Sequence, residues 1–392
     1  IYPLDDKKEW DYTPTAKVGD EVFAGDSVGW VPEGIFQHKI MVPFAFKGEF
    51  TVKSVIEAGQ YNIDTVIAVL TNEEGEDVNV TMTQKWPVKV AIKGYAIEIN
   101  DRPIYQRLVL DQGFYGPGVY TAEDDGDFAK DILRSKRLGF NGARLHERVF
   151  DRLFLYECDR LGYLVWGEYA NWGFDHCADN GLQYYLPEWS ESIERDYNHP
   201  ALIGWGPFNE TWNWDTHSKL HPGCLQNDAL IAEIYAQTKR LDPYRPVIDS
   251  SGNYHVVTDI YDIHDYQQDL AALHRRYDNM PDGEVFENRA ERQTYGGQPY
   301  FISEYGGIRW TKDMSLEKTE ASWGYGDTPK SLEEYIERYT EMANILIGNK
   351  RICGLCYTQL YDVEQEQNGL YFYDRTPKFS EETMDKLAAA MA

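Results

Sequence analysis

Basic residues are scarce in this chain. Its 392 residues include 38 Lys and Arg against 65 Asp and Glu, which gives a formal net charge of −27. Nucleic acids and anionic membrane surfaces are bound through lysine and arginine, so this balance argues against both as partners. The excess of acidic groups is typical of a solvated acidic surface.

Cysteine and long apolar runs are also scarce. The five cysteines are few and odd in number, which disfavours a disulfide framework. Cys353 and Cys356 have CxxC spacing, but they lie inside an apolar run, and we interpret them as core thiols. No run reaches the roughly 18 apolar residues of a membrane span, and no segment resembles a signal peptide. We expect a cytoplasmic protein, although the start at Ile1 leaves a removed or truncated upstream region open.

Aromatic residues, in contrast, are plentiful at 14% of the chain, with 29 Tyr and 11 Trp. Many of them are expected in the core. Others suit carbohydrate binding, because the flat apolar faces of sugar rings stack on aromatic planes while polar groups form hydrogen bonds.

The apolar pattern divides the chain into two regions. Residues 1 to about 92 contain short Val- and Ile-rich runs, with turns such as Gly19-Asp20 and Gly75-Glu76 between them. This pattern is typical of a small all-β barrel or sandwich. From about residue 95, strands alternate with amphipathic helices, for example at 332–346. We therefore expect two domains, 1–94 and 95–392.

Eight apolar strand candidates in the second region predict an α/β fold, a (β/α)8 TIM barrel. They are 104–110, 140–145, 163–167, 201–208, 246–248, 258–264, 300–303 and 352–358. Functional groups of such a barrel gather at the C-terminal ends of its strands. The polar and aromatic residues found there are Asp111, Gln112, Arg144, His146, Glu168, Asn209, Glu210, Asp249, His264, Tyr266, Glu304, Tyr357 and Gln359.

Two glutamates stand out among these residues, Glu210 in WGPFNETW and Glu304 in PYFISEYGG. Each ends an apolar run, where a buried strand emerges into solvent. Two carboxylates on separate strand ends of one barrel can flank a glycosidic bond, one as acid and base and the other as nucleophile. For either glutamate alone, a capped or salt-bridged strand end is the simpler interpretation.

Residues from about 95 to 379 resemble the catalytic barrel of glycoside hydrolase family two, the family of β-galactosidases, β-glucuronidases and β-mannosidases. The matching strings are IEINDRPIYQRLVLDQGFY, LGFNGARLH, CDRLGYLVWGE, RDYNHPALIGWGPFNETW, LDPYRPVIDSSG, FISEYGG and GLCYTQLYDVEQEQNGLYFYDRTPK. The resemblance implies a retaining exo-β-glycosidase acting on a carbohydrate, and we expect it to be β-galactosidase-like. No Asn-x-Lys pair like that of the β-glucuronidases is evident near 360–378. No cofactor or metal cluster is expected.

The resemblance also implies roles for individual residues. Glu304 would attack the anomeric carbon, while Glu210 would act first as acid and then as base. Asn209 would bind the sugar 2-hydroxyl, Tyr266 would donate to Glu304, and Arg144 would keep Glu304 ionised. The other candidates for the sugar subsite are His146, Glu168, Asn171, Asp249, His264, Trp323, Tyr357 and Gln359.

Simpler structural roles remain open for several of these residues. They are an ordinary ion pair for Arg144, core positions for His146 and His264, a place in the barrel rim for Asp249 and a loop anchor for Trp323.

Residues 1–94 resemble a different family, the bulge segment of the catalytic A subunit of vacuolar- and archaeal-type ATPases. The strings that carry this resemblance are IYPLDDKKEWDYTPTAKVGDEVFAGDSVGWV, QHKIMVP and MTQKWPVKVAIKGY. A GxxxxGK[ST] phosphate loop is missing from the whole chain, so nucleotide hydrolysis has no site. The segment also has the rhythm of biotinyl-like barrels, but Lys39 in HKIM does not match their Met-Lys-Met. The chain is therefore interpreted as a fusion with its joint near Gly94.

Two further interpretations of function remain open. The barrel could bind sugars without turnover, because the β-sandwich and immunoglobulin-like domains that precede it in well-known relatives are not recognisable here. An ATPase assembly role rests on the first 94 residues alone. We expect the N-terminal region to supply no catalytic group. Its aromatic residues are candidates to cover barrel surface, namely Trp10, Tyr12, Phe44, Phe46 and Trp86.

Overall fold

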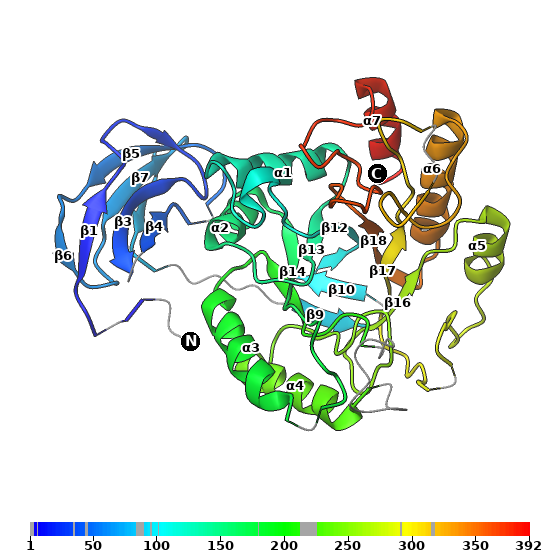
Figure 1. The fold of residues 1–392 in the computed structure, drawn as a ribbon. Helices are drawn as coiled ribbons and strands as arrows, with labels where there is room; N and C mark the ends of the chain where they lie inside the picture. The colour runs from blue at the N-terminus through cyan, green and yellow to red at the C-terminus, as the bar shows by residue number, and fades with distance from the viewer. Residues whose placement is uncertain are drawn as a thin grey trace. The chain divides into compact units, whose positions relative to one another are not determined.

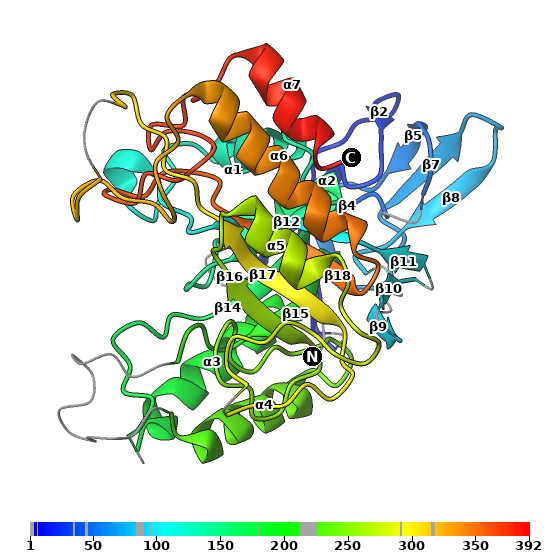
Figure 2. The same ribbon diagram turned by 90° about the vertical axis from the view of Figure 1, so that its right-hand side faces the viewer.

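The computed structural model divides the chain into two compact units, residues 1–88 and 89–392 (Figures 1 and 2). Among the described residues, the first unit contains strands only, whereas the second alternates strands and helices. The described residues are 4–5, 7–33, 36–43, 46–83, 90–94, 96–100, 102–178, 180–211, 226–290, 292–314 and 318–392.

The first unit consists of two four-stranded antiparallel sheets, with strand orders β4-β3-β1-β6 and β2-β5-β7-β8. Gly19 and Gly75 form turns with φ of 94° and 82°, at positions where the sequence predicts turns. The strands are β1 (Trp10–Pro14), β2 (Glu21–Val22), β3 (Ser27–Glu33), β4 (Phe36–Met41), β5 (Phe50–Val55), β6 (Gly59–Tyr61), β7 (Ala68–Asn72) and β8 (Asp77–Val80).

The first unit has an apolar core of its own. Trp10 and Tyr12 belong to this core rather than to a cover for another surface, and Phe46 packs against it. Phe44 and Trp86 lie outside the described residues. In β5, buried and exposed residues alternate over its first four positions, as expected for a strand with one face on the core.

The second unit is a TIM barrel, as the sequence predicts. Seven parallel strands follow the order β15-β14-β13-β12-β18-β17-β16. All seven lie within three residues of the predicted bounds at both ends, and the largest differences are at the start of β16 and the end of β17. The strands are β12 (Gln106–Asp111), β13 (Gly142–Leu145), β14 (Leu164–Glu168), β15 (Leu202–Gly206), β16 (Tyr261–Asp265), β17 (Tyr300–Gly306) and β18 (Ile352–Thr358).

The segment at 246–248 takes the fifth strand position, between β15 and β16. The Trp205 amide donates to the Pro246 carbonyl at 3.0 Å, and the Ile248 amide donates to the Trp205 carbonyl at 2.9 Å. On the other side, the Asp259 amide donates to the Val247 carbonyl at 2.9 Å. No helix follows this strand. The chain passes from residue 252 to β16 in nine residues, which is too short for a helix and its two loops.

Seven α-helices are described in the second unit, and α6 matches the helix predicted at 332–346 with two more residues at its end. Polar side chains cap several of the helices, including Asp151 on α2, Asn227 on α4 and Ser331 on α6. In Figure 2, α5 and α6 lie side by side. The helices are α1 (Gly126–Arg137), α2 (Arg152–Leu161), α3 (Leu182–Asp196), α4 (Asp228–Leu241), α5 (Leu270–Tyr277), α6 (Leu332–Gly348) and α7 (Glu381–Ala389), with a 3-10 turn η1 (Gly116–Gly118).

A small antiparallel sheet precedes the barrel, formed by β9 (Val90–Lys93), β10 (Ala96–Ile99) and β11 (Arg102–Ile104). Gly94, where the sequence pattern changes, lies in the turn between β9 and β10 and has a φ of 62°. Ile97 of β10 packs with barrel residues such as Leu108 and Trp166 in one apolar cluster. The small sheet is therefore part of the barrel's own packing.

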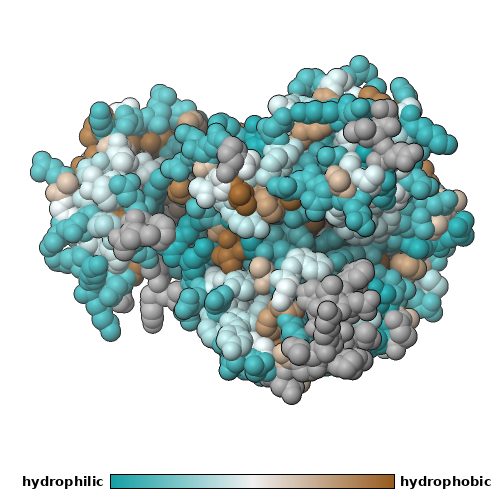
Figure 3. Space-filling view, viewed as in Figure 1, coloured by the Kyte–Doolittle hydropathy of each residue, from teal (hydrophilic) through white to brown (hydrophobic). Residues whose placement is uncertain are grey.

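The thiols of Cys353 and Cys356 are free and buried in this same cluster, in agreement with the core interpretation. Cys158 is also free and buried, and Cys177 is disulfide-bonded. Among the described residues, no helix has the length and apolar character that crossing a membrane requires. Hydrophilic residues dominate the face shown in Figure 3.

Candidate functional site

Glu304 lies within β17, and Glu210 lies four residues after the end of β15. Glu210 adopts a φ of 46°, in the left-handed region that side-chain-bearing residues rarely occupy. Such a backbone costs about 1–3 kcal/mol and is found mainly at functional sites, where surrounding contacts hold it. The Glu210 amide donates to the Ser251 carbonyl at 3.0 Å, which fixes the turn after β15 against the fifth strand.

The Glu304 carboxylate is 3% exposed and is held from two sides. Arg144 Nη1 lies 3.1 Å from its Oε1, and the Tyr266 hydroxyl donates to its Oε2. Burial by itself raises the pKa of Glu304, but the charges of His264, Arg144 and His146 and the bond from Tyr266 outweigh it, so that the pKa is lowered. Glu304 is therefore ionised at neutral pH.

Arg144, on β13, joins three strand ends through one buried guanidinium. Its Nε donates to Glu168 Oε1 at 2.6 Å, and its Nη2 donates to Asn209 Oδ1 at 3.1 Å. Burial raises the pKa of Glu168, but Arg144 and His146 reverse this and lower it to about 2. Arg144 thus forms a barrel ion pair with Glu168 and also contacts Glu304 directly.

His264, on β16, lies between the two glutamates. Its Nδ1 is 2.7 Å from Glu210 Oε1 and 3.3 Å from Glu304 Oε2. One oxygen or nitrogen atom from each of these three residues lies within 4.8 Å of the others. The 2.7 Å between His264 Nδ1 and Glu210 Oε1 is the length of a direct hydrogen bond, and Arg144 already supplies a cation beside Glu304, so we interpret the three as a hydrogen-bonded cluster rather than as metal ligands. The short distances place His264 in the same polar cluster as both carboxylates.

Asn209 and Asn171 bind each other through two hydrogen bonds. The Asn209 amide donates to Asn171 Oδ1 at 2.7 Å, and Asn171 Nδ2 donates to the Asn209 carbonyl at 2.8 Å. This pair ties the loop after β14 to the end of β15. Asn171 therefore positions Asn209, the residue next to Glu210.

Family models match both parts of the chain. Residues 90–392 match the family model "Glycosyl hydrolases family 2, TIM barrel domain". The chain belongs to glycosyl hydrolase family 2. Residues 1–89 match a second model, "ATPsynthase alpha/beta subunit barrel-sandwich domain". The V-type ATP synthase alpha chain of Protochlamydia amoebophila is 47% identical over 89 residues, which are 23% of this chain and 15% of that protein.

Solved structures of the family share the fold. A GH2 β-galacturonidase from Eisenbergiella tayi, bound to galacturonate, is 18% identical with a TM-score of 0.56, and the match covers 97% of this chain and 66% of that one. A β-glucuronidase from Parabacteroides merdae is 16% identical with a TM-score of 0.61, and the match covers 100% of this chain and 49% of that one. This chain thus spans about two thirds or less of the length of these relatives.

Further residues of the family 2 barrel surround the glutamates. His146 Nδ1 lies 3.2 Å from Glu168 Oε2. Burial lowers the pKa of His146, but Glu168 and Glu304 raise it to about 9. Gln359 accepts a hydrogen bond from Gln112 at 2.9 Å and donates to Asn368 at 2.9 Å.

Two glutamates of the cluster escaped the sequence analysis. Glu147 has a φ of 56°, and its Oε2 accepts the amides of Asn171 at 2.7 Å and Trp172 at 3.1 Å. Burial raises the pKa of Glu147 to about 7. Glu366 accepts Gln112 Nε2 at 3.1 Å and Asn368 Nδ2 at 3.1 Å. Glu366 lies inside the string GLCYTQLYDVEQEQNGLYFYDRTPK, which carries the family resemblance, and Glu147 directly follows the string LGFNGARLH; this position is the only signal that either residue carried.

Of three further candidates, Asp249 and Tyr357 are held by contacts outside the cluster, whereas Trp323 lies beside it. The Asp249 carboxylate accepts the amides of Val256 at 2.6 Å and Val257 at 2.9 Å and lies 2.7 Å from His255 Nδ1, so it orders the barrel rim. Tyr357 is fully buried between the sheet and α6, with its hydroxyl 3.4 Å from that of Tyr335. Trp323 pairs its backbone with Gln365 and Gln367 and packs edge-on against Tyr325, a ring that stacks on Tyr266.

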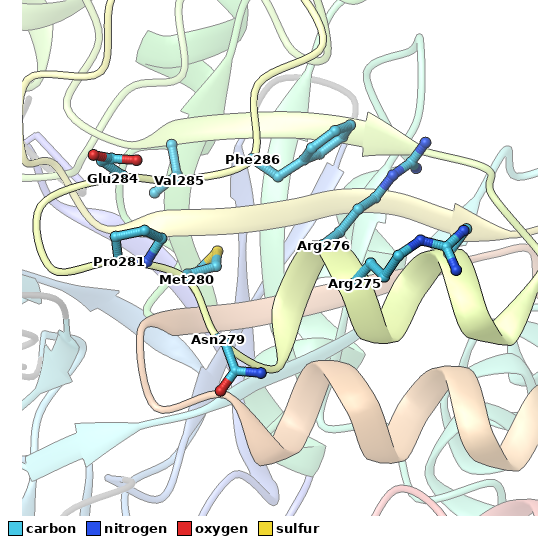
Figure 4. A pocket seen from close by; sticks show the side chains of 9 residues that line it. Arg275, Arg276, Asn279, Met280, Pro281, Glu284, Val285 and Phe286 are labelled. Atoms are coloured by element: carbon cyan, nitrogen blue, oxygen red, sulfur yellow. The ribbon is translucent and has the colours of Figure 1, made fainter.

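A cavity of about 390 Å³ lies beside α5 and the segment 279–286 (Figure 4). Arg276 faces it, with its guanidinium over the Phe286 ring and in an ion pair with Asp265. Neither Glu210 nor Glu304 is among the residues that line this cavity. It is therefore distinct from the cluster at the strand ends.

Proposed function

We propose that the barrel is a retaining exo-β-glycosidase that removes terminal β-linked sugars through a covalent glycosyl-enzyme, with a β-galactosidase-like preference for a neutral sugar. One observation carries the proposal: a carboxylate oxygen of Glu210 and one of Glu304 lie within 4.8 Å of each other. Retaining enzymes hold their two carboxyl groups about 5–5.5 Å apart, whereas inverting enzymes leave about 6.5–9.5 Å for a water molecule.

In the first step, the Glu304 carboxylate attacks the anomeric carbon while the bond to the leaving oxygen breaks and Glu210 protonates that oxygen. In the second, Glu210 removes a proton from water, whose oxygen displaces Glu304 from the anomeric carbon. Arg144 and Tyr266 hold Glu304 ionised and oriented for the attack. Asn209, fixed by Asn171 and Arg144, binds the sugar 2-hydroxyl, a contact that strengthens in the transition state.

The preference for a neutral sugar is supported by the charges around Glu304. Glu366 lies close enough to interact electrostatically with both Glu304 and His146, and burial raises its pKa. The nearby cations already have partners, since Arg144 binds Glu168 and Glu304, and His146 binds Glu168. A uronate would bring one more carboxylate into this group, whereas a hydroxyl can donate to Glu366.

The test is a panel of nitrophenyl β-glycosides that includes galactoside, glucoside, mannoside, arabinoside and glucuronide. We expect nitrophenol release, fastest from a neutral sugar, with the first-formed product in the β configuration by proton NMR. Release from none of them would favour a sugar-binding barrel without turnover. A glucuronide as the best substrate would contradict the assignment of Glu366, and an α-configured first product would contradict the retaining mechanism.

A further inference from the structure

His264 offers a function that the two-carboxylate mechanism does not use. It is 7% exposed, and its ring is packed against Gly252, where an added Cβ would lie 2.2 Å from the ring. The register between β16 and β17 shifts between Ile263 and His264, an irregularity of the kind that redirects side chains beside active sites. The ring is therefore fixed in one orientation between Glu210 and Glu304.

The hydrogen bonds of Ser251 decide which nitrogen of His264 carries a proton. Ser251 Oγ donates to Asp262 Oδ2 at 2.6 Å, and His264 Nε2 lies 3.1 Å from the same hydroxyl. Burial raises the pKa of Asp262, but His255, His264 and Ser251 outweigh it and lower the pKa, so Asp262 is ionised and takes the hydroxyl proton. Ser251 then accepts from His264, which places a proton on Nε2.

The second nitrogen, Nδ1, faces Glu210 at 2.7 Å. It can accept the proton of a neutral Glu210, or it can be protonated and donate to an ionised one. The two arrangements differ only in the position of one proton, so this proton belongs to the pair rather than to either residue.

We propose that His264 and Glu210 share the proton that is delivered to the leaving oxygen, which makes His264 a positioning residue for the acid and base step. This inference rests on the proposed function. In the first step the pair gives its proton to the leaving oxygen as that oxygen separates from the anomeric carbon. In the second step the pair regains a proton from the attacking water.

The charged groups around His264 act in opposite directions. Burial lowers the pKa of His264, but Glu304 on β17 and Glu210 after β15 raise it, while Arg144 on β13 opposes them. Asp262 on β16 faces the ring through Ser251. A protonated His264 in turn lowers the pKa of Glu304, in which its charge is the largest lowering contribution.

The decisive variant is His264→Asn, which keeps an amide near the position of Nδ1 but cannot hold a proton. We expect a narrower bell in the pH profile of kcat/KM. The acid limb moves to higher pH because Glu304 loses a neighbouring positive charge, and the alkaline limb moves to lower pH because the shared proton loses one of its two holders. Each limb is expected to move by about one pH unit or more. His274→Asn, at a partly exposed position of α5 away from the cluster, is the matched control and leaves both limbs in place.

If His264→Asn does not fold, Ser251→Ala keeps the imidazole and removes only the group that sets its tautomer, and the alkaline limb is expected to move in the same direction. Proton sharing can also be measured without turnover, from the histidine 15N shifts. We expect His264 to lose its proton at lower pH in Glu210→Gln than in the unaltered protein. If the protein hydrolyses no glycoside but His264 still titrates at lower pH in Glu210→Gln, the proposed function is rejected and the shared proton is not. If the pH limbs do not move in His264→Asn, or if His264 titrates at the same pH in Glu210→Gln and in the unaltered protein, the shared proton is rejected and the proposed function is not.

Discussion

The two units of this chain bury different kinds of side chain. In the first unit, the described residues that are buried are apolar or aromatic, such as Val28, Val52 and Leu70, and the Lys53–Asp77 ion pair is exposed. In the barrel, charged groups such as Arg144 and Glu304 are almost inaccessible. A buried charge is costly unless it is paired, so a fold that retains several of them at one place does so for chemistry rather than for stability.

This contrast predicts that all of the chemistry lies in the barrel. The described polar side chains of the first unit are exposed or half-buried, and substitutions there are expected to have small effects on stability. Those of the barrel form one connected group, in which Arg144 joins Glu168, Glu304 and Asn209. Removing one member leaves its partners buried without a counter-charge. Substitutions of the same chemical kind in the two units are therefore expected to differ sharply in effect.

The largest effect is expected for Glu304→Gln, which keeps the shape of the side chain and removes the attacking charge. We expect kcat to fall on the order of 10⁴-fold or more, as when other covalent nucleophiles are removed. The matched control is Glu74→Gln, an exposed glutamate of the first unit, and it should not change turnover. Both are measured with the best nitrophenyl glycoside of the panel. Comparable turnover rates for Glu304→Gln and Glu74→Gln would show that the buried glutamate of the barrel matters no more for catalysis than an exposed one of the first unit.

Glu210→Gln should have a smaller effect, and one that depends on the leaving group. With a poorly leaving alcohol, the loss of the acid is expected to reduce kcat/KM by about 10²–10⁴-fold. With dinitrophenol, which leaves without protonation, the first step should be nearly unaffected and the glycosyl-enzyme should accumulate. Azide, which needs no base, is expected to restore the second step. Equal losses for both leaving groups would argue that Glu210 is not the acid.

Much of this arrangement could be predicted from local sequence signals. An apolar run that ends in a polar residue marks a strand end, and this signal predicts Arg144, Glu304 and Asn209 at the strand ends of one barrel. The orientation of single residues within a strand could not be predicted in the same way. Tyr357 faces α6 instead of the cluster, and the register of β17 against β18 shifts between Ile302 and Tyr305, which interrupts simple alternation.

The contacts of residues on loops could not be predicted from the strand-end pattern either. Glu366 approaches the cluster because the chain after β18 turns back and pairs with the Trp323 segment. Asp249 was predicted to line the sugar site from its position at a strand end, but the short connection to β16 lacks a helix, and Asp249 supplies the hydrogen bonds that order this connection instead. Both outcomes depend on contacts between segments far apart in sequence, which no local period encodes.

Arg144→Met tests the contrast through stability. It leaves the carboxylates of Glu168 and Glu304 buried without their shared cation, and breaking a buried pair in this way costs about 3–5 kcal/mol. The matched change in the first unit is Lys53→Met, whose pair with Asp77 is exposed, and it should leave the unfolding midpoint unchanged. Urea unfolding followed by fluorescence and circular dichroism measures both. Equal midpoints for the two variants would show that Glu168 and Glu304 tolerate burial without Arg144.

The smallest effect on turnover is expected from removing the first unit altogether. Its core residues form a cluster of their own, separate from the two clusters of the barrel, and the strand β9 that follows pairs with β10 of the barrel unit. A cut before Lys89 therefore separates two units that each have an apolar core of their own. We expect residues 1–88 to fold alone, with the circular dichroism of a β-protein, and residues 89–392 to keep kcat and KM. Light scattering and circular dichroism on the barrel fragment distinguish aggregation from a catalytic defect. A barrel fragment that stays folded and monomeric yet loses turnover would mean that the first unit contributes to the site. The inference that all of the chemistry lies in the barrel would then be wrong.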